Sequence, residues 1–224
     1  MRINADFSKR VVIRAQDYNW VDSPMPGVER MMLDRIGDEV ARATSLVRFA
    51  PNSTFSPHVH SGGEEFLVLE GEFGDEHQTY PAGTYVRNPI GTSHSPRVGD
   101  HGCIILVKLH QFDEKDTTPV VLDTHDTNLP SESVPGLTTT LLHQFEEERV
   151  LLVRWEPNTP FKEHTHIGGE EVFVIAGSFS DENGDYPAGS WVRYPDQSSH
   201  NAFTRDEGAV LFLKVGHLPA GDDD

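Results

Sequence analysis

Hydrophobic and polar residues follow one another along this chain in short runs, and the repeat of three to four residues that marks a long helix is missing. Runs rich in β-branched and aromatic residues recur, and Gly, Pro, Asn or Asp interrupts them about every eight to twelve residues. Residues 64–71 form one such run, which ends at a glycine. The pattern is typical of antiparallel strands in a sandwich or barrel. It predicts an all-β fold.

A repeat divides the chain into two similar halves. Residues 51–110 align without a gap on residues 157–216, and 26 of the 60 aligned pairs are identical. The connecting residues 111–135 are rich in Asp, Thr, Pro and Ser, as expected of a linker. We therefore predict two domains, residues 1–120 with an N-terminal arm and residues 121–224.

Each half carries three histidines and a glutamate with the spacing of a metal site. On a strand, two histidines separated by one residue leave from the same face, and a glycine turn can bring the glutamate back beside them. The first set is His58, His60, Glu64 and His94, and the second set is His164, His166, Glu170 and His200. A barrel interior cannot bury six imidazoles and two carboxylates unpaired at low cost. We predict one divalent metal ion for each domain.

Charge and composition exclude several classes of protein. With 18 basic and 36 acidic residues the formal net charge is -18, which disfavours contact with a phosphate backbone, so we expect no nucleic-acid partner. No apolar run approaches the length of a bilayer span, and the N-terminus lacks the apolar core of a secretion signal, so we expect a soluble, cytoplasmic protein without a membrane partner. The single cysteine, Cys103, lies in an apolar run and is predicted to be a buried core residue.

The two ligand sets lie in motifs that resemble those of the cupin family. The first motif, G-x5-H-x-H-x3-E-x6-G, matches residues 52–71 and 158–177, with Asn52 and Asn158 at the leading glycine. The second motif, G-x5-P-x-G-x2-H-x3-N, matches residues 83–98 and 189–204, with Val98, Gln197 and Thr204 as departures. The resemblance implies a duplicated cupin, or bicupin, built of two tandem jelly-roll (double-stranded β-helix) barrels.

Residues 42–51, 58–71 and 80–89 are similar, more narrowly, to the cupin domain of ChrR-type anti-sigma factors. Members of that group pair this cupin with a separate zinc module that holds the sigma factor and is built on a histidine and a C-x-x-C pair. One cysteine does not provide such a pair. The resemblance implies a metal-binding module that responds to a small molecule or to oxidative stress, with a sigma factor as a candidate partner.

The identity of the metal, zinc, iron, manganese or nickel, decides the function. Four protein ligands nearly fill a tetrahedral zinc ion but leave about two positions open on an octahedral metal. A closed zinc site favours a structural or regulatory module. Open positions on Fe(II) favour a dioxygenase that cleaves a small diketone or hydroxyketone, and a metal-dependent isomerase is a third alternative. A small organic molecule is the expected partner, with a homodimer as a candidate assembly, and the sequence singles out no catalytic residue.

Other repeated residues refine this picture. Glu65 and Glu171 follow the ligands, and strand alternation points them away from the metal face, which favours a salt bridge. Arg87 and Arg193 either hold an anionic substrate at the barrel mouth or form surface ion pairs. Four apolar residues lie two or four positions after the ligand glutamates, on the same face of the strand, and predict an apolar pocket for a small organic ligand. They are Phe66, Val68, Val172 and Val174.

One departure distinguishes the two sites. Gly91 suits a tight turn with positive φ, and Gln197 stands at the corresponding position in the second half. We therefore expect Gln197 to tilt His200 and to weaken the second site. On this reasoning chemistry is expected first at the site of His58.

Overall fold

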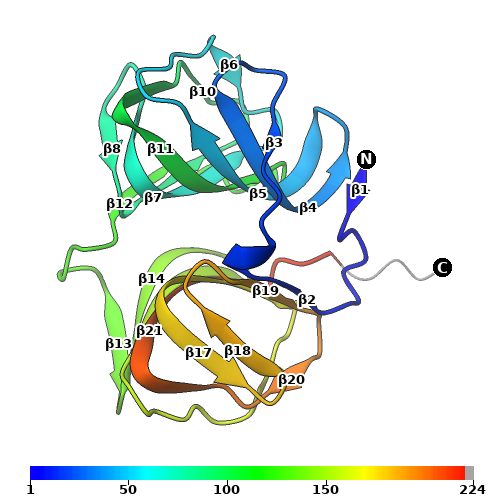
Figure 1. The fold of residues 1–224 in the computed structure, drawn as a ribbon, viewed down its shortest axis with the longest axis vertical. Coiled ribbons are helices and arrows are strands. Elements are labelled where there is room, and N and C mark those ends of the chain that lie inside the picture. The colour runs from blue at the N-terminus through cyan, green and yellow to red at the C-terminus, as the bar shows by residue number, and fades with distance from the viewer. Residues whose placement is uncertain (220–224) are drawn as a thin grey trace. The chain divides into compact units, whose positions relative to one another are not determined.

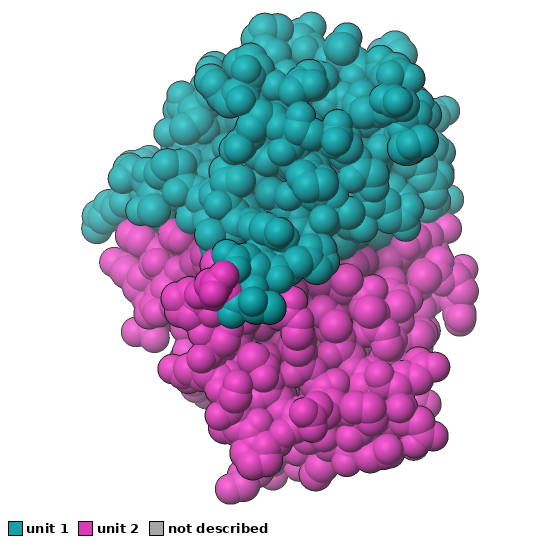
Figure 2. Space-filling model, turned by 90° about the vertical axis from the view of Figure 1, so that its left-hand side faces the viewer, with its two compact units in different colours: residues 1–5, 19–127 teal, residues 6–18, 128–224 magenta. Residues whose placement is uncertain are grey.

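The computed structural model describes residues 1–219. Within them the regular elements are strands, apart from one short 3₁₀ turn, η1 (Ala15–Asp17), and this confirms the all-β prediction. The chain folds as two compact units: unit 1 contains residues 1–5 and 19–127, and unit 2 contains residues 6–18 and those from 128 onward (Figure 2). In residues 1–219, no helix has the length and apolar character needed to cross a bilayer.

Unit 1 is a barrel of antiparallel strands (Figure 1). Its strands are β1 (Arg2–Ile3), β3 (Val21–Asp22), β4 (Val28–Gly37), β5 (Ala41–Phe49), β6 (His58–Val59), β7 (Glu64–Gly74), β8 (Thr79–Pro81), β9 (Thr84–Asn88), β10 (Ser93–His94), β11 (Arg97–Leu109) and β12 (Val120–Asp123). The main sheet runs in the order β1-β4-β5-β11-β7-β9-β12, with β3 beside β4 and β8 beside β7. Strands β6 and β10 form a separate pair.

Unit 2 repeats this architecture. Its strands are β2 (Val11–Ile13), β13 (Ser131–Val134), β14 (Leu137–Phe145), β15 (Glu148–Trp155), β16 (His164–Thr165), β17 (Glu170–Asp181), β18 (Gly184–Pro187), β19 (Trp191–Tyr194), β20 (Ser199–His200) and β21 (Phe203–Val215). The main sheet runs β13-β14-β15-β21-β17-β19-β2, with β18 beside β17, and β16 pairs with β20. The predicted pair of tandem barrels is therefore confirmed.

Alternation along the strands fills the interior of each barrel, because every second side chain points to the same face. The four apolar residues predicted to share the inner face are all buried in the two cores: Phe66 and Val68 in unit 1, and Val172 and Val174 in unit 2. Cys103 is also buried in the core of unit 1, as predicted.

A glycine bend in β7 and β17 explains why both copies of the first motif end in glycine. Gly71 in β7 and Gly177 in β17 have φ values of 71° and 67°. A Cβ atom at these positions would lie 2.0 Å and 2.1 Å from the carbonyl oxygens of Gly102 and Gly208. Neither the backbone angle nor the space admits a side chain, so the glycine is required for the strand to bend around the barrel.

The strand at one edge of each barrel comes from outside the aligned repeat of residues 51–110 and 157–216. In unit 1, β12 pairs with β9, and in unit 2 the N-terminal strand β2 pairs with β19. From the sequence we assigned the N-terminal arm to the first domain, whereas residues 6–18 fold as part of unit 2. The boundary near residue 120 stays a prediction. The structure adds that β2 and β12 occupy equivalent edges.

Candidate metal centres

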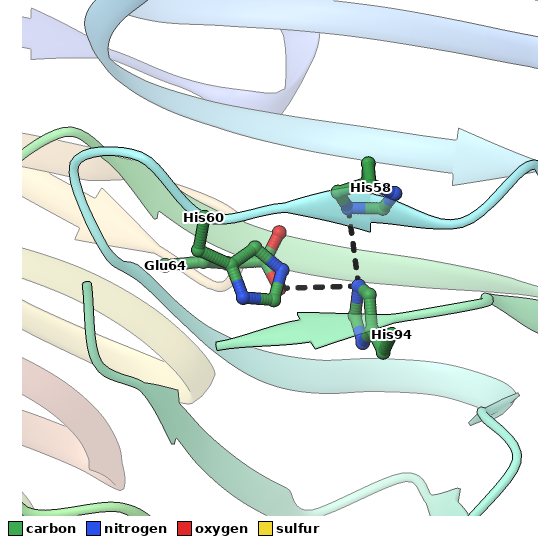
Figure 3. Close-up of side chains that lie close together, drawn as sticks. All are labelled: His58, His60, Glu64 and His94. Carbon is green, nitrogen blue, oxygen red and sulfur yellow. Dashed lines mark hydrogen bonds and ion pairs between the residues drawn. The ribbon is translucent and has the colours of Figure 1, made fainter. Parts of the chain in front are cut away.

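The first histidine cluster is built on the short strand pair β6 and β10. His58 on β6 lies directly opposite His94 on β10 in the antiparallel register. His60 follows His58 by two residues and shares its face, and the Gly62–Gly63 turn brings Glu64 to the start of β7. The four side chains converge, as Figure 3 shows. The sequence spacing alone predicted this convergence.

The four ligand atoms of the first cluster lie within 4.8 Å of one another. His94 Nε2 is 3.2 Å from His58 Nε2, and Glu64 Oε1 is 3.3 Å from His60 Nε2 and 3.7 Å from His94 Nε2. A metal ion with bonds of about 2 Å holds its ligand atoms about 3 to 4 Å apart. The spacing therefore suits one metal ion.

Hydrogen bonds on the far side of two rings fix which nitrogen faces the centre. His58 Nδ1 is 3.3 Å from the carbonyl oxygen of Ser56, which only accepts, so Nδ1 carries the proton and donates it. Thr92 Oγ1 donates to the carbonyl oxygen of Pro89 and accepts from His60 Nδ1 at 2.9 Å. Both Nε2 atoms are left with a lone pair toward the centre, as a metal ligand requires.

Burial keeps two imidazoles of the first cluster, those of His60 and His94, neutral. Desolvation, with the neighbouring histidines, lowers the pKa of His60 to about 3 and that of His94 to about 4. Desolvation raises the pKa of Glu64 to about 7, and a 3.1 Å hydrogen bond from Asn88 Nδ2 to Glu64 Oε1 opposes this rise. Neutral imidazoles are ready ligands at neutral pH without losing a proton.

The second cluster reproduces the first in unit 2. His164 lies opposite His200 in the β16–β20 pair, and the ligand atoms again lie within 4.8 Å of one another. His164 Nδ1 donates to the carbonyl oxygen of Lys162 at 3.1 Å. Burial lowers the pKa of His166 to about 3 and raises that of Glu170 to about 8. The same backbone arrangement thus presents the same ligand types twice.

Gln197 keeps the turn beside the second cluster, contrary to the expected tilt of His200, and the expected weakening of the second site stays a prediction. Gln197 adopts φ 61° and Gly91 adopts φ 86°, and each donates its backbone N–H to the carbonyl oxygen of the central histidine, at 2.9 Å to His166 and 3.0 Å to His60. The turn is kept, at a cost of about 1 to 2 kcal/mol for a left-handed residue with a side chain. His200 stays in register with its partner strand.

Each cluster has a buried aspartate behind its last histidine, which the sequence analysis missed. His94 Nδ1 is 3.8 Å from Asp75 Oδ2, and His200 Nδ1 is 3.5 Å from Asp181 Oδ2. Tyr80 donates its hydroxyl to Asp75 at 2.7 Å. A carboxylate behind a ligand histidine orients the ring and raises its basicity. Both aspartates are identical in the repeat, which was the available signal.

The hydrogen-bond network around the aspartate behind His200 includes one more tyrosine and an arginine than the network behind His94. Tyr186 and Tyr194 donate their hydroxyls to Asp181 at 2.7 Å and 2.8 Å. Arg10, which precedes β2, lies 3.4 Å from the same carboxylate and donates to the hydroxyl of Tyr186. Hydrogen bonds from these groups hold the pKa of Asp181 below its usual value despite its burial. The N-terminal segment therefore supports the second cluster from outside.

A cavity of about 510 Å³ opens on the second cluster. All four members of the cluster line it, and its other walls are mainly apolar. The apolar lining residues include Leu151, Val153, Trp155, Phe161, Val172 and Leu213. In unit 1 the position of Val172 is taken by Phe66, whose ring packs against Phe73 and Tyr80 with centroids 5.1 Å and 6.0 Å away. The larger ring fills space that valine leaves open.

The repeated glutamates and arginines beside the ligands are structural. Glu65 and Arg87 form a buried ion pair at 2.6 Å, and Arg87 also contacts Asp116. The sequence-based salt-bridge interpretation holds, although the pair is buried and not at the surface. Arg193 is fully buried, lies over the ring of Phe7 and donates to a backbone carbonyl. These charges face away from the metal side of the strands.

The donor set fits a divalent metal ion in both units. His60 Nε2 and His166 Nε2 are buried and make no hydrogen bond with the described residues. A buried nitrogen lone pair without a partner costs free energy, and a metal ion would satisfy it. Of the other six histidines, none belongs to a cluster of this kind within residues 1–219: His77, His101, His110, His125, His143 and His217.

The fold and the paired clusters define a duplicated cupin. The family model described as the ChrR cupin-like domain matches residues 8–113 and 117–219, and the chain belongs to this family. The first matched repeat includes β2, which lies in unit 2, and the second includes β12, which lies in unit 1. The two repeats therefore exchange their N-terminal strands.

Solved structures show the same fold at low sequence identity. A candidate dioxygenase from Nostoc punctiforme has a TM-score of 0.77 at 17% identity, over 93% of this chain and 82% of that one. A candidate glyoxylate-induced protein from Pseudomonas aeruginosa has a TM-score of 0.73 at 16% identity, over 96% of this chain and 92% of that one. Oxalate decarboxylase from Lactobacillus farciminis, in a formate complex, has a TM-score of 0.63 at 13% identity, over 94% of this chain and 86% of that one. A search of the curated protein sequences found no match.

Proposed function

We propose that the protein is a metal-dependent oxygenase that converts a small organic molecule in the cavity of the second barrel. The observation that carries this proposal is that His164, His166, Glu170 and His200 all line a largely apolar cavity of about 510 Å³. A closed structural site has no need of such a space, whereas a substrate site requires it. The cytoplasm is the location that we expect.

Iron(II) is the metal that this proposal assigns to the second cluster. Three imidazoles and one carboxylate suit iron, and four protein ligands leave about two positions of an octahedral ion open. Bound there, Fe(II) supplies the redox chemistry needed to use dioxygen in cleaving a small diketone or hydroxyketone. The likeness in fold to a candidate dioxygenase supports the same class of reaction.

The protein residues have separate roles in this proposal. The three histidines and Glu170 hold the ion, and Asp181 orients His200 from behind. The apolar walls, among them Val153 and Val172, hold the carbon skeleton of the substrate and exclude water. The first cluster, in a barrel whose interior Phe66 and Phe73 fill, is proposed to hold a metal that stabilises its unit.

The test is oxygen uptake by the iron-loaded protein with β-diketones and hydroxyacetophenones as substrates. We expect His164→Ala to abolish uptake and His58→Ala to leave at least half of it, with the metal content of each variant measured alongside. Uptake lost in His58→Ala and kept in His164→Ala would move the chemistry to the first barrel. No uptake by the iron-loaded protein with either substrate class contradicts an oxygenase of this kind.

A regulatory function is the second candidate, and the match to the ChrR cupin-like family favours it. In that case zinc closes both clusters, and binding of a small molecule in the cavity changes the affinity for a sigma factor. Co-purification with a sigma factor in a manner that the small molecule alters would support this function. Zinc in the purified protein together with no sigma-factor binding would contradict it.

A further inference from the structure

Arg149 introduces an unpaired positive charge at the cavity of the second barrel. It is exposed, lies on β15 and lines the cavity together with Leu151 and Val153 from the same face of that strand. Its guanidinium makes no hydrogen bond or ion pair with other side chains of residues 1–219. A cation at the rim of an apolar cavity without a protein partner is a feature that selects anions.

The strand register places Arg149 in the same row as a ligand of the second cluster. Arg149 is paired with Val215 on β21, and Val215 is paired with Glu170 on β17. Adjacent strands lie about 4.8 Å apart, so the Cα atoms of Arg149 and Glu170 are roughly 10 Å apart along this row. Residues directly opposite one another in antiparallel strands point to the same face. The guanidinium and the metal cluster therefore face one space.

The matching row of the first barrel lacks this charge. Ala43 is paired with Leu109, and Leu109 is paired with Glu64. Ala43 is buried and occupies the position that Arg149 has in the second barrel. The two barrels share their metal ligands, but in this row only the second carries an arginine. Because the fold and the metal ligands are the same in both barrels, the change from Ala43 to Arg149 bears on which ligand each barrel binds.

We propose that the cavity of the second barrel binds a small monocarboxylate, with the carboxylate on Arg149 and the apolar body against the cavity walls. This inference rests on the proposed function because it names the substrate class of the same site. A guanidinium binds a carboxylate with two parallel hydrogen bonds, which fixes the orientation of the ligand as well as its affinity. The remaining end of the molecule then lies toward the histidine cluster.

The surroundings of Arg149 favour one negative charge over several. Glu147, in the turn before β15, is exposed and also lines the cavity. Its carboxylate repels a second anionic group near the mouth. Apart from the metal ligands and the neutral hydroxyls of Thr139 and Thr165, the other walls are mainly apolar, as at Leu151 and Leu213, and carry no second cation for another carboxylate. A monoanion with an apolar body of a few carbons fits both features.

The test is calorimetric binding of hexanoate and benzoate, with hexanamide and benzamide as uncharged analogues of the same shape. The metal-loaded wild-type protein is expected to bind each carboxylate at least tenfold tighter than its amide. Arg149→Gln should remove this preference and Arg149→Lys should retain part of it. Arg154→Gln is the matched control, because Arg154 is exposed on the opposite face of the same strand, and it should bind as the wild type does.

A metal ion can also bind a carboxylate, so the same titrations are repeated with His164→Ala. A carboxylate preference that persists in Arg149→Gln but is lost in His164→Ala overturns the inference, while leaving the proposed metal-dependent function intact. Equal affinity of the wild type for carboxylates and amides also overturns it. Conversely, a preference that depends on Arg149 in a protein without oxygen uptake supports the inference and counts against the oxygenase.

Discussion

Tyr194 stacks on the imidazole of His166, with ring centroids 5.2 Å apart and planes inclined by 18°. At the matching position of the first barrel Asn88 donates a hydrogen bond to the carboxylate of Glu64. Both residues lie opposite the ligand glutamate in the strand register. The two clusters thus have the same ligands, but an amide supports the carboxylate in one and an aromatic ring covers an imidazole in the other.

Asn88→Ala is expected to weaken metal binding at the first cluster alone. The amide stabilises the ionised form of Glu64, which is the form that binds a metal, so its loss raises the pKa of that carboxyl further. A lost hydrogen bond to a charged group corresponds to about 1.5 to 3 kcal/mol, or roughly a tenfold or greater loss of affinity at pH 7. Competition with a chromophoric chelator resolves the two sites, and the second serves as internal control. Equal weakening of both sites would contradict this assignment.

Metal content should fall by one ion per chain when either central histidine is removed. His60→Ala and His166→Ala each delete a buried ligand from a different cluster, so each variant is expected to bind half the metal of the wild type. His125→Ala is the control, because His125 is exposed and belongs to neither cluster. Elemental analysis of the purified proteins gives the ratio. Unchanged metal in His166→Ala would mean that the second cluster holds none.

The metal-free protein is expected to lose stability as the pH rises from 6.5 to 8. Glu64 and Glu170, with pKa values of about 7 and about 8, keep protons in the folded state that the unfolded chain has lost above its ordinary value of 4.5. Their contribution is present below that value and disappears as the pH passes through the folded pKa. The lowered pKa values of His60, His94, His166 and His200 act in the opposite sense, and their effect ends about one pH unit above the ordinary value of 6.5.

In that window the glutamates lose roughly 2 to 3 kcal/mol and the histidines offset part of it, so the net loss should be roughly 1 kcal/mol, since one pKa unit corresponds to about 1.4 kcal/mol. Urea unfolding in the presence of a chelator at several pH values measures it. A bound metal holds both carboxylates ionised and should remove the decline. The double variant Glu64→Gln and Glu170→Gln lacks both of these carboxyls and should show no decline. A chelated wild type that is more stable at pH 8 than at pH 6.5 would refute the assignment.

The sequence predicted the ligand clusters because each depends on local spacing. His58 and His60 share a face of one strand for any barrel, and the glycine turn limits where Glu64 can go. Repetition of the same spacing at His164 and His166 favoured a site over packing. The repeat also marks the aspartates behind His94 and His200, because Asp75 and Asp181 are identical at corresponding positions.

Other features depend on pairing between distant strands and could not be read from the sequence. The N-terminal strand β2 has three residues, and its pairing with β19 in unit 2 leaves no local pattern. Arg149 joins the row of Glu170 only through the register of β21. Gln197 was expected to tilt His200, but the strain of one left-handed residue is small against the register that holds His200.

The buried ion pair of Glu65 and Arg87 should be sensitive to loss of either partner. Arg87→Ala leaves a buried carboxylate without its cation and is expected to cost about 3 to 5 kcal/mol. Arg205→Ala is the control, because the ion pair of Arg205 with Asp185 is exposed and should contribute less than about 1 kcal/mol. Thermal and urea unfolding measure both variants.

Replacing both members of the buried pair separates the charge effect from packing. Glu65→Leu combined with Arg87→Met removes the two charges and keeps much of the volume, so the double variant should be more stable than Arg87→Ala. Asp116 then loses its contact with the guanidinium, which limits the recovery. If the double variant is as unstable as the single one, the packing of the arginine under the ring of Phe112, 4.0 Å from the guanidinium carbon, matters more than its charge.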